Sequence, residues 1–111
     1  MGQKYPLTQL AEVIRSKNAG PFELTLDIIF KEQATYEKVK ADRAVTRELV
    51  AGLYKIPVEK IIALVEFDPA RAIKITMERP RPAGELGETD VYGAQQHGPL
   101  LALEIELADE S

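Results

Sequence analysis

The stretch Phe22-Glu23-Leu24-Thr25-Leu26-Asp27-Ile28-Ile29-Phe30 decides the fold, because apolar and polar residues alternate along most of it. Alternation with a period of two indicates a β-strand with one face in a core and one more polar face. We expect the apolar side chains at positions 22, 24, 26, 28 and 30 to be buried. The more polar face carries Glu23, Thr25 and Asp27.

The segment before this strand predicts an amphipathic helix from Pro6 to Asn18. Its apolar residues fall on one face at helical spacing: Leu7, Leu10, Ala11 and Ile14. The following Asn-Ala-Gly-Pro sequence at residues 18–21 predicts the end of the helix, because glycine accepts a left-handed cap and proline blocks continuation.

The rest of the chain predicts further helices and strands. Helices are expected over 34–42 and from an N-cap at Thr46 to residues 52–54, and strands over 61–67, 73–77 and 100–107. In the last strand, Leu101, Leu103, Ile105 and Leu107 are expected to point inward. This order predicts one α+β domain over residues 1–111. We expect a two-layer ferredoxin-like sandwich with an added N-terminal helix.

Composition narrows the class of protein. With 45% hydrophobic and 29% charged residues, the 111-residue chain can bury the core of one domain. A net charge of −4 argues against a general nucleic-acid binder, which needs a basic surface. The chain has no cysteine, no apolar leader at its start and no apolar run long enough for a membrane span. We therefore expect a cytoplasmic domain.

The polar segment from Asp90 to Pro99 is the strongest candidate for a functional site. It holds the single histidine of the chain, His97, which is suited to acid–base catalysis near neutral pH. Asp90 is predicted to orient it, and Gln95 and Gln96 to bind substrate oxygens. The alternative is that these side chains only tie a loop to the sheet.

A second polar segment spans residues 15–20. Arg15 offers a cationic donor, and Ser16 and Asn18 offer directional hydrogen bonds, so the three are predicted to bind a carboxylate or phosphate. The alternative is a helix C-cap whose cations favour the negative end of the helix dipole.

Other sites have weaker support. One histidine with scattered carboxylates gives no zinc-ligand spacing, and no glycine-rich phosphate loop occurs, so we predict no metal and no cofactor. Four basic residues cluster at Arg71, Lys74, Arg79 and Arg81. They indicate either a self-neutralising charged surface or part of an anion site.

Three runs carry a resemblance to a known family. They are the run from Val13 to Asp27, Phe67-Asp68-Pro69-Ala70, and the run from Thr89 to His97. They resemble a small bacterial family of unknown function whose members accompany proteins similar to acyclic-terpene-utilisation proteins. The resemblance extends from about Leu7 to Leu107, and the chain is similar to the small ferredoxin-like domain of those systems.

The resemblance implies a small subunit that works with a larger partner handling carboxylates or acyl groups. Our leading hypothesis is therefore an accessory subunit in carboxylic-acid or acyl-CoA catabolism, which contributes an anion-binding site. One alternative is a self-sufficient homo-oligomeric lyase or hydratase with His97 as acid and base. Another is a non-catalytic ligand-binding or structural module. An exposed edge strand also makes a homo-oligomer possible.

Overall fold

Two antiparallel sheets and a set of short helices form the described part of the chain, residues 2–20, 22–78 and 98–108, in the computed structural model. The elements are β1 (Gly2–Pro6), α1 (Leu7–Leu10), β2 (Ala11–Gly20), β3 (Glu23–Phe30), α2 (Gln33–Ala41), α3 (Arg47–Tyr54), η1 (Val58–Lys60), β4 (Ile61–Phe67), η2 (Asp68–Ala70), β5 (Ala72–Glu78), α4 (Gly98–Leu101) and β6 (Glu104–Ala108). The predicted α+β class is confirmed. Among the described helices, none is long and apolar enough to cross a membrane.

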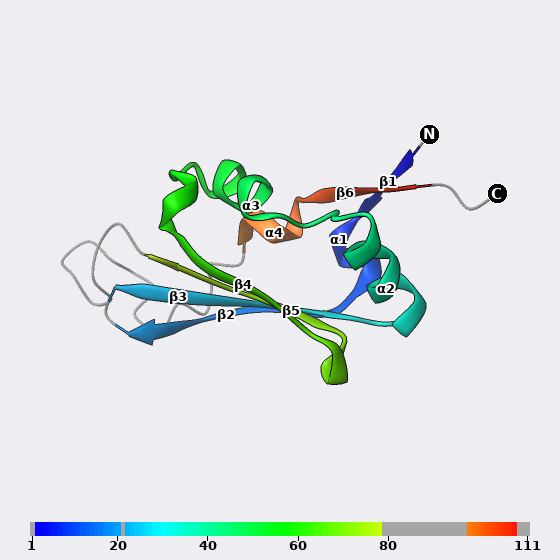
Figure 1. The fold of residues 1–111 in the computed structure, drawn as a ribbon, viewed down its shortest axis with the longest axis horizontal. Helices are drawn as coiled ribbons and strands as arrows, with labels where there is room; N and C mark the ends of the chain where they lie inside the picture. Colours follow the sequence, from blue (N-terminus) through cyan, green and yellow to red (C-terminus); the bar gives the residue numbers. More distant parts are fainter. Residues whose placement is uncertain (1, 21, 79–97, 109–111) are drawn as a thin grey trace.

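The main sheet has four strands in the order β2-β3-β5-β4, and each neighbouring pair is antiparallel. Strands β3 and β4 therefore run parallel with β5 between them, and α2 and α3 connect them along the chain. The second sheet pairs β1 with β6. Figure 1 shows the α-helices and the β1–β6 sheet on the same side of the main sheet. The opposite face, which we call the open face, is covered by none of these described elements.

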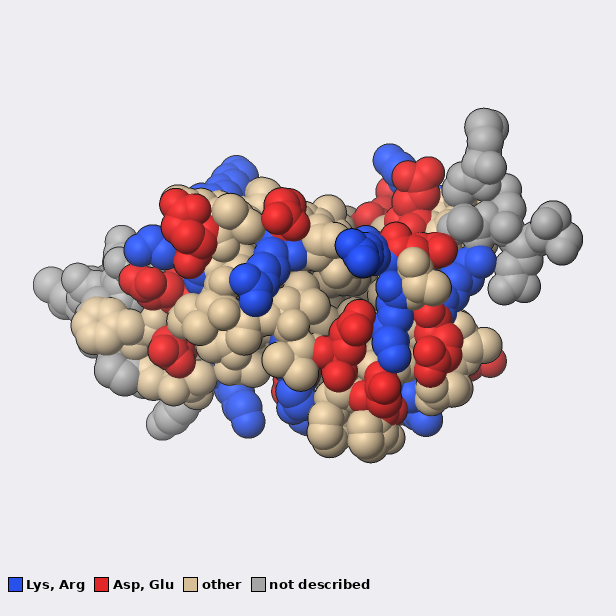
Figure 2. Space-filling model, viewed as in Figure 1, with Lys and Arg blue, Asp and Glu red and all other residues tan. Residues whose placement is uncertain are grey.

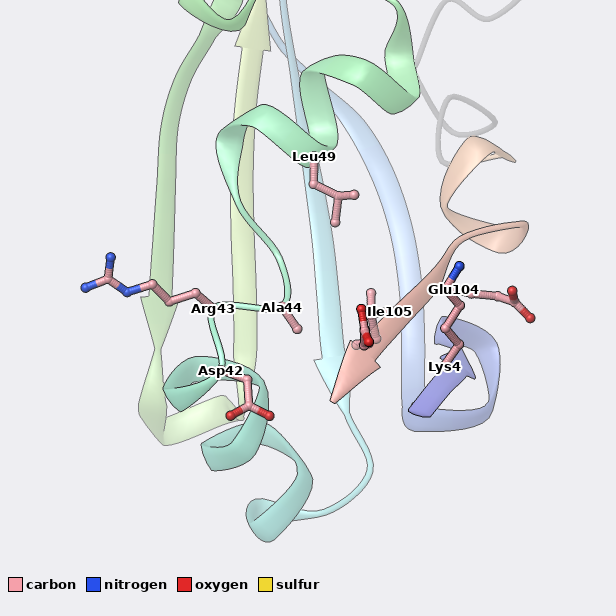
Figure 3. Close-up of a pocket in the computed structure, with 8 residues that line it drawn as sticks. Lys4, Asp42, Arg43, Ala44, Leu49, Glu104 and Ile105 are labelled. Carbon is pink, nitrogen blue, oxygen red and sulfur yellow. The ribbon is translucent and has the colours of Figure 1, made fainter. Parts of the chain in front are cut away.

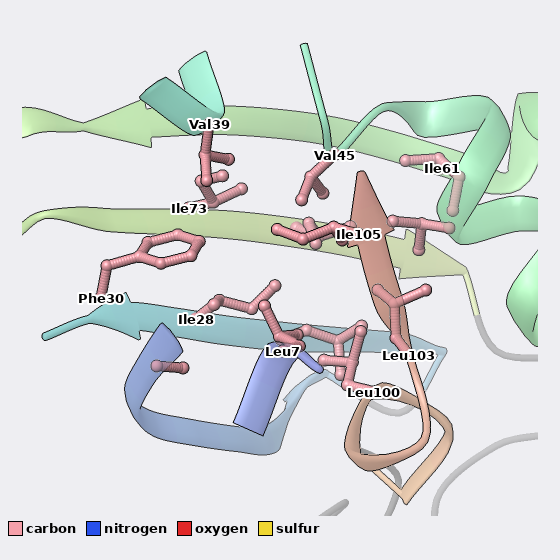
Figure 4. Close-up of a cluster of buried hydrophobic side chains, with 14 of the residues drawn as sticks. Leu7, Ile28, Phe30, Val39, Val45, Ile61, Ile73, Leu100, Leu103 and Ile105 are labelled. Atoms are coloured by element: carbon pink, nitrogen blue, oxygen red, sulfur yellow. The ribbon is translucent and has the colours of Figure 1, made fainter. Parts of the chain in front are cut away.

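The core lies between the main sheet and this second layer. Strand β3 contributes four side chains that are at most 2% exposed, and β5 contributes three of similar burial: Leu24, Leu26, Ile28 and Phe30, then Ile73, Ile75 and Met77. Figure 4 shows Leu7, Leu100 and Ile105 from the second layer packed among these strands. Removing this apolar surface from water is the dominant stabilising term.

The predicted N-terminal helix is wrong beyond its first turn. Only Leu7–Leu10 is helical, and Ala11–Gly20 forms β2, which pairs along its length with β3. Residues 13–18, Val-Ile-Arg-Ser-Lys-Asn, do not alternate between apolar and polar side chains, so no strand pattern is visible in the sequence there. Pairing with β3 makes the segment a strand. Gly20 has a positive φ of +150°, which is not the left-handed helical value predicted for a helix cap, because it ends a strand that begins a hairpin.

Two apolar side chains are more exposed than the alternation predicts. Phe22 precedes β3 and is 54% exposed. Leu101 lies in the short helix α4 and is 49% exposed, whereas Leu100 is fully buried. The last strand therefore begins at Glu104, although Leu103, Ile105 and Leu107 are buried as predicted.

The other elements agree with the sequence. The helices predicted over 34–42 and after Thr46 are α2 and α3, and the Thr46 hydroxyl caps α3 by accepting a hydrogen bond from the Leu49 backbone N–H. The strand predicted over 61–67 is β4, and β5 returns antiparallel to it through the turn η2. A ferredoxin-like sandwich would place the last strand in the main sheet, whereas β6 pairs with β1.

Candidate functional site

The open face of the main sheet is organised in rows that cross its four strands. Residues that are direct partners in an antiparallel pair point to the same face, so the register defines each row. The apolar row consists of Val13, Ile29, Ala72 and Phe67; the ionic row of Arg15, Asp27, Lys74 and Val65; and the hydroxyl row of Lys17, Thr25, Thr76 and Ala63. The ionic row lies between the other two.

A buried carboxylate stands at the centre of the ionic row. The side chain of Asp27 is 3% exposed, although it belongs to the open face. Arg15 Nε donates a hydrogen bond to Asp27 Oδ2 at 3.0 Å from one neighbouring strand. Lys74 Nζ approaches Asp27 Oδ1 at 3.5 Å from the other. The carboxylate thus interacts with a cation through each of its oxygens.

The two cations remain accessible to solvent. The side chains of Arg15 and Lys74 are 58% and 45% exposed. A guanidinium carries five N–H groups and an ammonium three, so both have more donor capacity than Asp27 uses. The ionic row carries two positive charges and one negative charge, and Lys17 adds a further positive charge in the next row. This arrangement can bind an anion whose oxygens accept charge-assisted hydrogen bonds.

The residues predicted to share an anion site with Arg15 lie on the other face of the sheet. Ser16 pairs with Leu26 and Asn18 with Leu24, and both leucines are buried in the core. Because successive side chains of a strand point to opposite faces, Arg15 is separated from these two residues. The structure brings Arg15 together with Asp27 and Lys74 instead.

The residues predicted for catalysis and for oxygen binding in the second polar segment, Asp90, Gln95, Gln96 and His97, lie outside the described residues. So do two members of the predicted basic cluster, Arg79 and Arg81. Of the other two, Lys74 belongs to the ionic row. Arg71 is used structurally, because its Nε donates to the Phe30 carbonyl oxygen at 3.1 Å.

A second charged cluster joins α2 to the turn η2. The Tyr36 hydroxyl and Lys40 Nζ donate to the same oxygen, Asp68 Oδ1, at 2.6 and 2.8 Å. The Lys40 hydrogen bond, helped by that of Tyr36, lowers the pKa of Asp68 below its usual range. Burial raises the pKa of Tyr36 above its usual range, and its bond to Asp68 adds to the effect. These two hydrogen bonds attach the turn between β4 and β5 to helix α2.

A cavity of about 570 Å³ opens between the α2–α3 connection and β6. Apolar side chains of Ala44, Leu49 and Ile105 line it together with charged residues of both signs, as Figure 3 shows. Figure 2 shows the same mixture of Lys and Arg with Asp and Glu over the visible face. In the described ranges, no three His, Cys, Asp or Glu side chains gather as metal ligands would. Because the charged residues that line the cavity are of both signs, the cavity does not favour a ligand of one particular charge.

The sequence indicates Arg15 and Lys74 as members of two separate candidate anion sites and Asp27 as a polar residue of its strand, but it does not predict that the three meet. Asp27 stands among apolar residues of β3, and a carboxylate in such a strand needs a cation or several donors beside it. The sequence therefore indicates that Asp27 has a charged or hydrogen-bonding partner. It does not say which cations meet Asp27, because the pairing with Arg15 and Lys74 depends on the register of three strands.

Comparison with known proteins gives a family match. The family model described as "Domain of unknown function (DUF4387)" matches residues 7–104. No curated protein matches the chain, and no solved structure matches it. The match spans the main sheet and the whole ionic row, and it ends where β6 begins.

Proposed function

The chain belongs to the DUF4387 family of unknown function, and from that premise we propose that it is a small accessory subunit. It acts with a larger protein resembling acyclic-terpene-utilisation proteins in carboxylic-acid or acyl-CoA catabolism, and it contributes an anion-binding site. The relation to a ferredoxin-like domain is part of this proposal. The arrangement β3-β5-β4, with helices between β3 and β4, supports it as a split β-α-β unit.

The observation that carries the proposal is the ionic row on the open face. Asp27 is buried, and it holds Arg15 and Lys74 with half of each cationic side chain still in solvent. Cations that are positioned in this way lose little conformational freedom when an anion binds. The Thr25 and Thr76 pair in the next row adds two hydroxyls that can donate to anion oxygens.

The same face suits contact with a larger protein. Phe67 and Val65 are 45% and 51% exposed and adjoin the charged positions. Interfaces combine an apolar centre with polar groups that fix orientation. An anion bound at Arg15 and Lys74 would lie between the two subunits, so the site would be completed by the partner.

The anion site is tested by a titration of the full chain with butyrate, followed by two-dimensional amide NMR. We expect saturable shifts in β2, β3 and β5 around Arg15 and Lys74. The Arg15→Gln variant should weaken binding at least tenfold. The matched Arg47→Gln variant, which makes the same change at an exposed position in α3, should bind as the unaltered chain does.

Two results would contradict the anion site. One is a titration with no shifts in the three strands at millimolar butyrate. The other is an equal loss of binding in Arg15→Gln and Arg47→Gln, because that would indicate a general effect of net charge rather than a site in the ionic row.

A further inference from the structure

Strand β4 forms an edge of the main sheet and is unusually apolar for an edge. Among the residues the structure describes, six large apolar side chains are exposed, and four of them fall within residues 58–67: Val58, Ile62, Val65 and Phe67. The strand itself, Ile-Ile-Ala-Leu-Val-Glu-Phe, contains one charged residue. An exposed, apolar edge strand presents unpaired backbone groups beside apolar side chains and favours pairing with another strand.

The opposite edge of the sheet has the features that prevent such pairing. Strand β2 carries Glu12, Arg15 and Lys17, and its register with β3 shifts near both ends. Charges and bulges are the usual protection of an edge strand. Strand β4 has one register shift, between Ile61 and Ala63, and is regular from Ala63 to Phe67. The two edges therefore differ in their capacity to accept a further strand.

We propose that β4 pairs antiparallel with β4 of a second copy of this chain, about a twofold axis at Leu64. This inference goes beyond the proposed function and does not rest on it. In that register Ala63 faces Val65 of the second copy, so small and large apolar side chains alternate across the axis. Lys60 and Asp68 lie just outside the two ends of the strand, in η1 and η2.

The charges of the strand are compatible with a second copy as the partner. Lys60 pairs with Glu78 at 3.2 Å and Asp68 with Lys40 at 2.8 Å within the chain, so the charges that flank β4 are compensated before a second copy binds. Glu66, the one charge within the strand, faces Ile62. No like charges are opposed in this register, so charge does not oppose the pairing of two copies. The pairing would join two four-stranded sheets into one whose open faces are continuous.

The test compares two double variants by light scattering after size exclusion, at concentrations from 1 to about 100 µM. Ala63→Lys/Val65→Glu places opposite charges across the axis, and Ala63→Glu/Val65→Glu places like charges at the same points. In both variants the glutamate that replaces Val65 lies beside Lys74 of the same chain, so its charge is compensated within the fold. Leu101→Glu, at an exposed apolar residue in α4, is the control, and circular dichroism checks folding.

We expect the unaltered chain, Leu101→Glu and Ala63→Lys/Val65→Glu to have the mass of two chains. Ala63→Glu/Val65→Glu should be folded with the mass of one chain, or dissociate at least tenfold more readily. The proposal is overturned if the unaltered chain is monomeric throughout, or if the two double variants behave alike. None of these results depends on butyrate binding, so this proposal and the anion site fail separately.

Discussion

Replacing Asp27 and Arg15 separately and then together tests the central geometry of the open face. Removing the carboxylate leaves two cations that are about half exposed, at 58% and 45%, and water can solvate both. Removing Arg15 leaves a carboxylate that is 3% exposed, with Lys74 at 3.5 Å as its remaining cation. Since a buried charge without full compensation is costly, the loss of the cation should be the more harmful change.

The expected magnitudes follow from these exposures. Arg15→Gln should lower the free energy of unfolding by about 2–3 kcal/mol, below the range for a fully buried pair because Lys74 remains. Asp27→Asn should cost about 1 kcal/mol, because the amide keeps the shape and an acceptor. The double variant should resemble Asp27→Asn, which gives a coupling energy of about 2–3 kcal/mol.

The assay is urea unfolding of the full chain. The slope of the unfolding free energy against urea concentration should be the same for all variants, because it reports the surface exposed on unfolding. Arg47→Gln serves as the control and should stay within about 0.5 kcal/mol of the unaltered chain. The reasoning is refuted if Asp27→Asn costs more than Arg15→Gln, or if the two single effects simply add in the double variant.

Three further outcomes follow from other parts of the structure. The folded pKa of Asp68 is lowered by two hydrogen bonds from α2, so its contribution to stability is present above the ordinary value of 3.8 and is lost as the pH falls through the lowered pKa. The melting temperature of Asp68→Asn should therefore lie below that of the unaltered chain at pH 6 and converge with it at acid pH. Leu100→Ala should cost about 2–5 kcal/mol in urea unfolding because the side chain is fully buried, whereas Leu101→Ala should cost less than about 0.5 kcal/mol. Gly52→Ala, in α3 with open space at the added Cβ, should raise the free energy of unfolding by about 0.5–1 kcal/mol. Gly20→Ala should lower it, because Gly20 has a φ of +150°. A higher melting temperature for Gly20→Ala than for Gly52→Ala would contradict the described backbone.

The fold could be predicted from the sequence wherever one periodicity dominates. Strand β3 and helix α3 each show a clear pattern and a clear boundary, and both are confirmed. In residues 7–20, Leu7, Leu10 and Ile14 have helical spacing, and the polar run from Arg15 to Asn18 shows no alternation that would indicate a strand. Residues 11–20 form a strand because they pair with β3, and this pairing cannot be predicted from the local sequence pattern.

The candidate site shows the same limit. Arg15 could be selected as a candidate anion-binding residue from its type and its neighbours. Its partner Lys74 lies 59 positions further along the chain, and only the register of β2, β3 and β5 brings the two to one carboxylate. Ser16 was grouped with Arg15 on sequence proximity, yet strand geometry directs it to the core side of the sheet.

The most direct test of the accessory-subunit proposal is native mass spectrometry of the tagged chain, purified gently from its own cells. We predict a complex in which the chain, as one or two copies, accompanies a larger protein in fixed stoichiometry, and Arg15→Glu should reduce the recovery of that protein while Arg47→Glu should not. Recovery of this chain alone, as a monomer or a homo-oligomer, would contradict the proposed role.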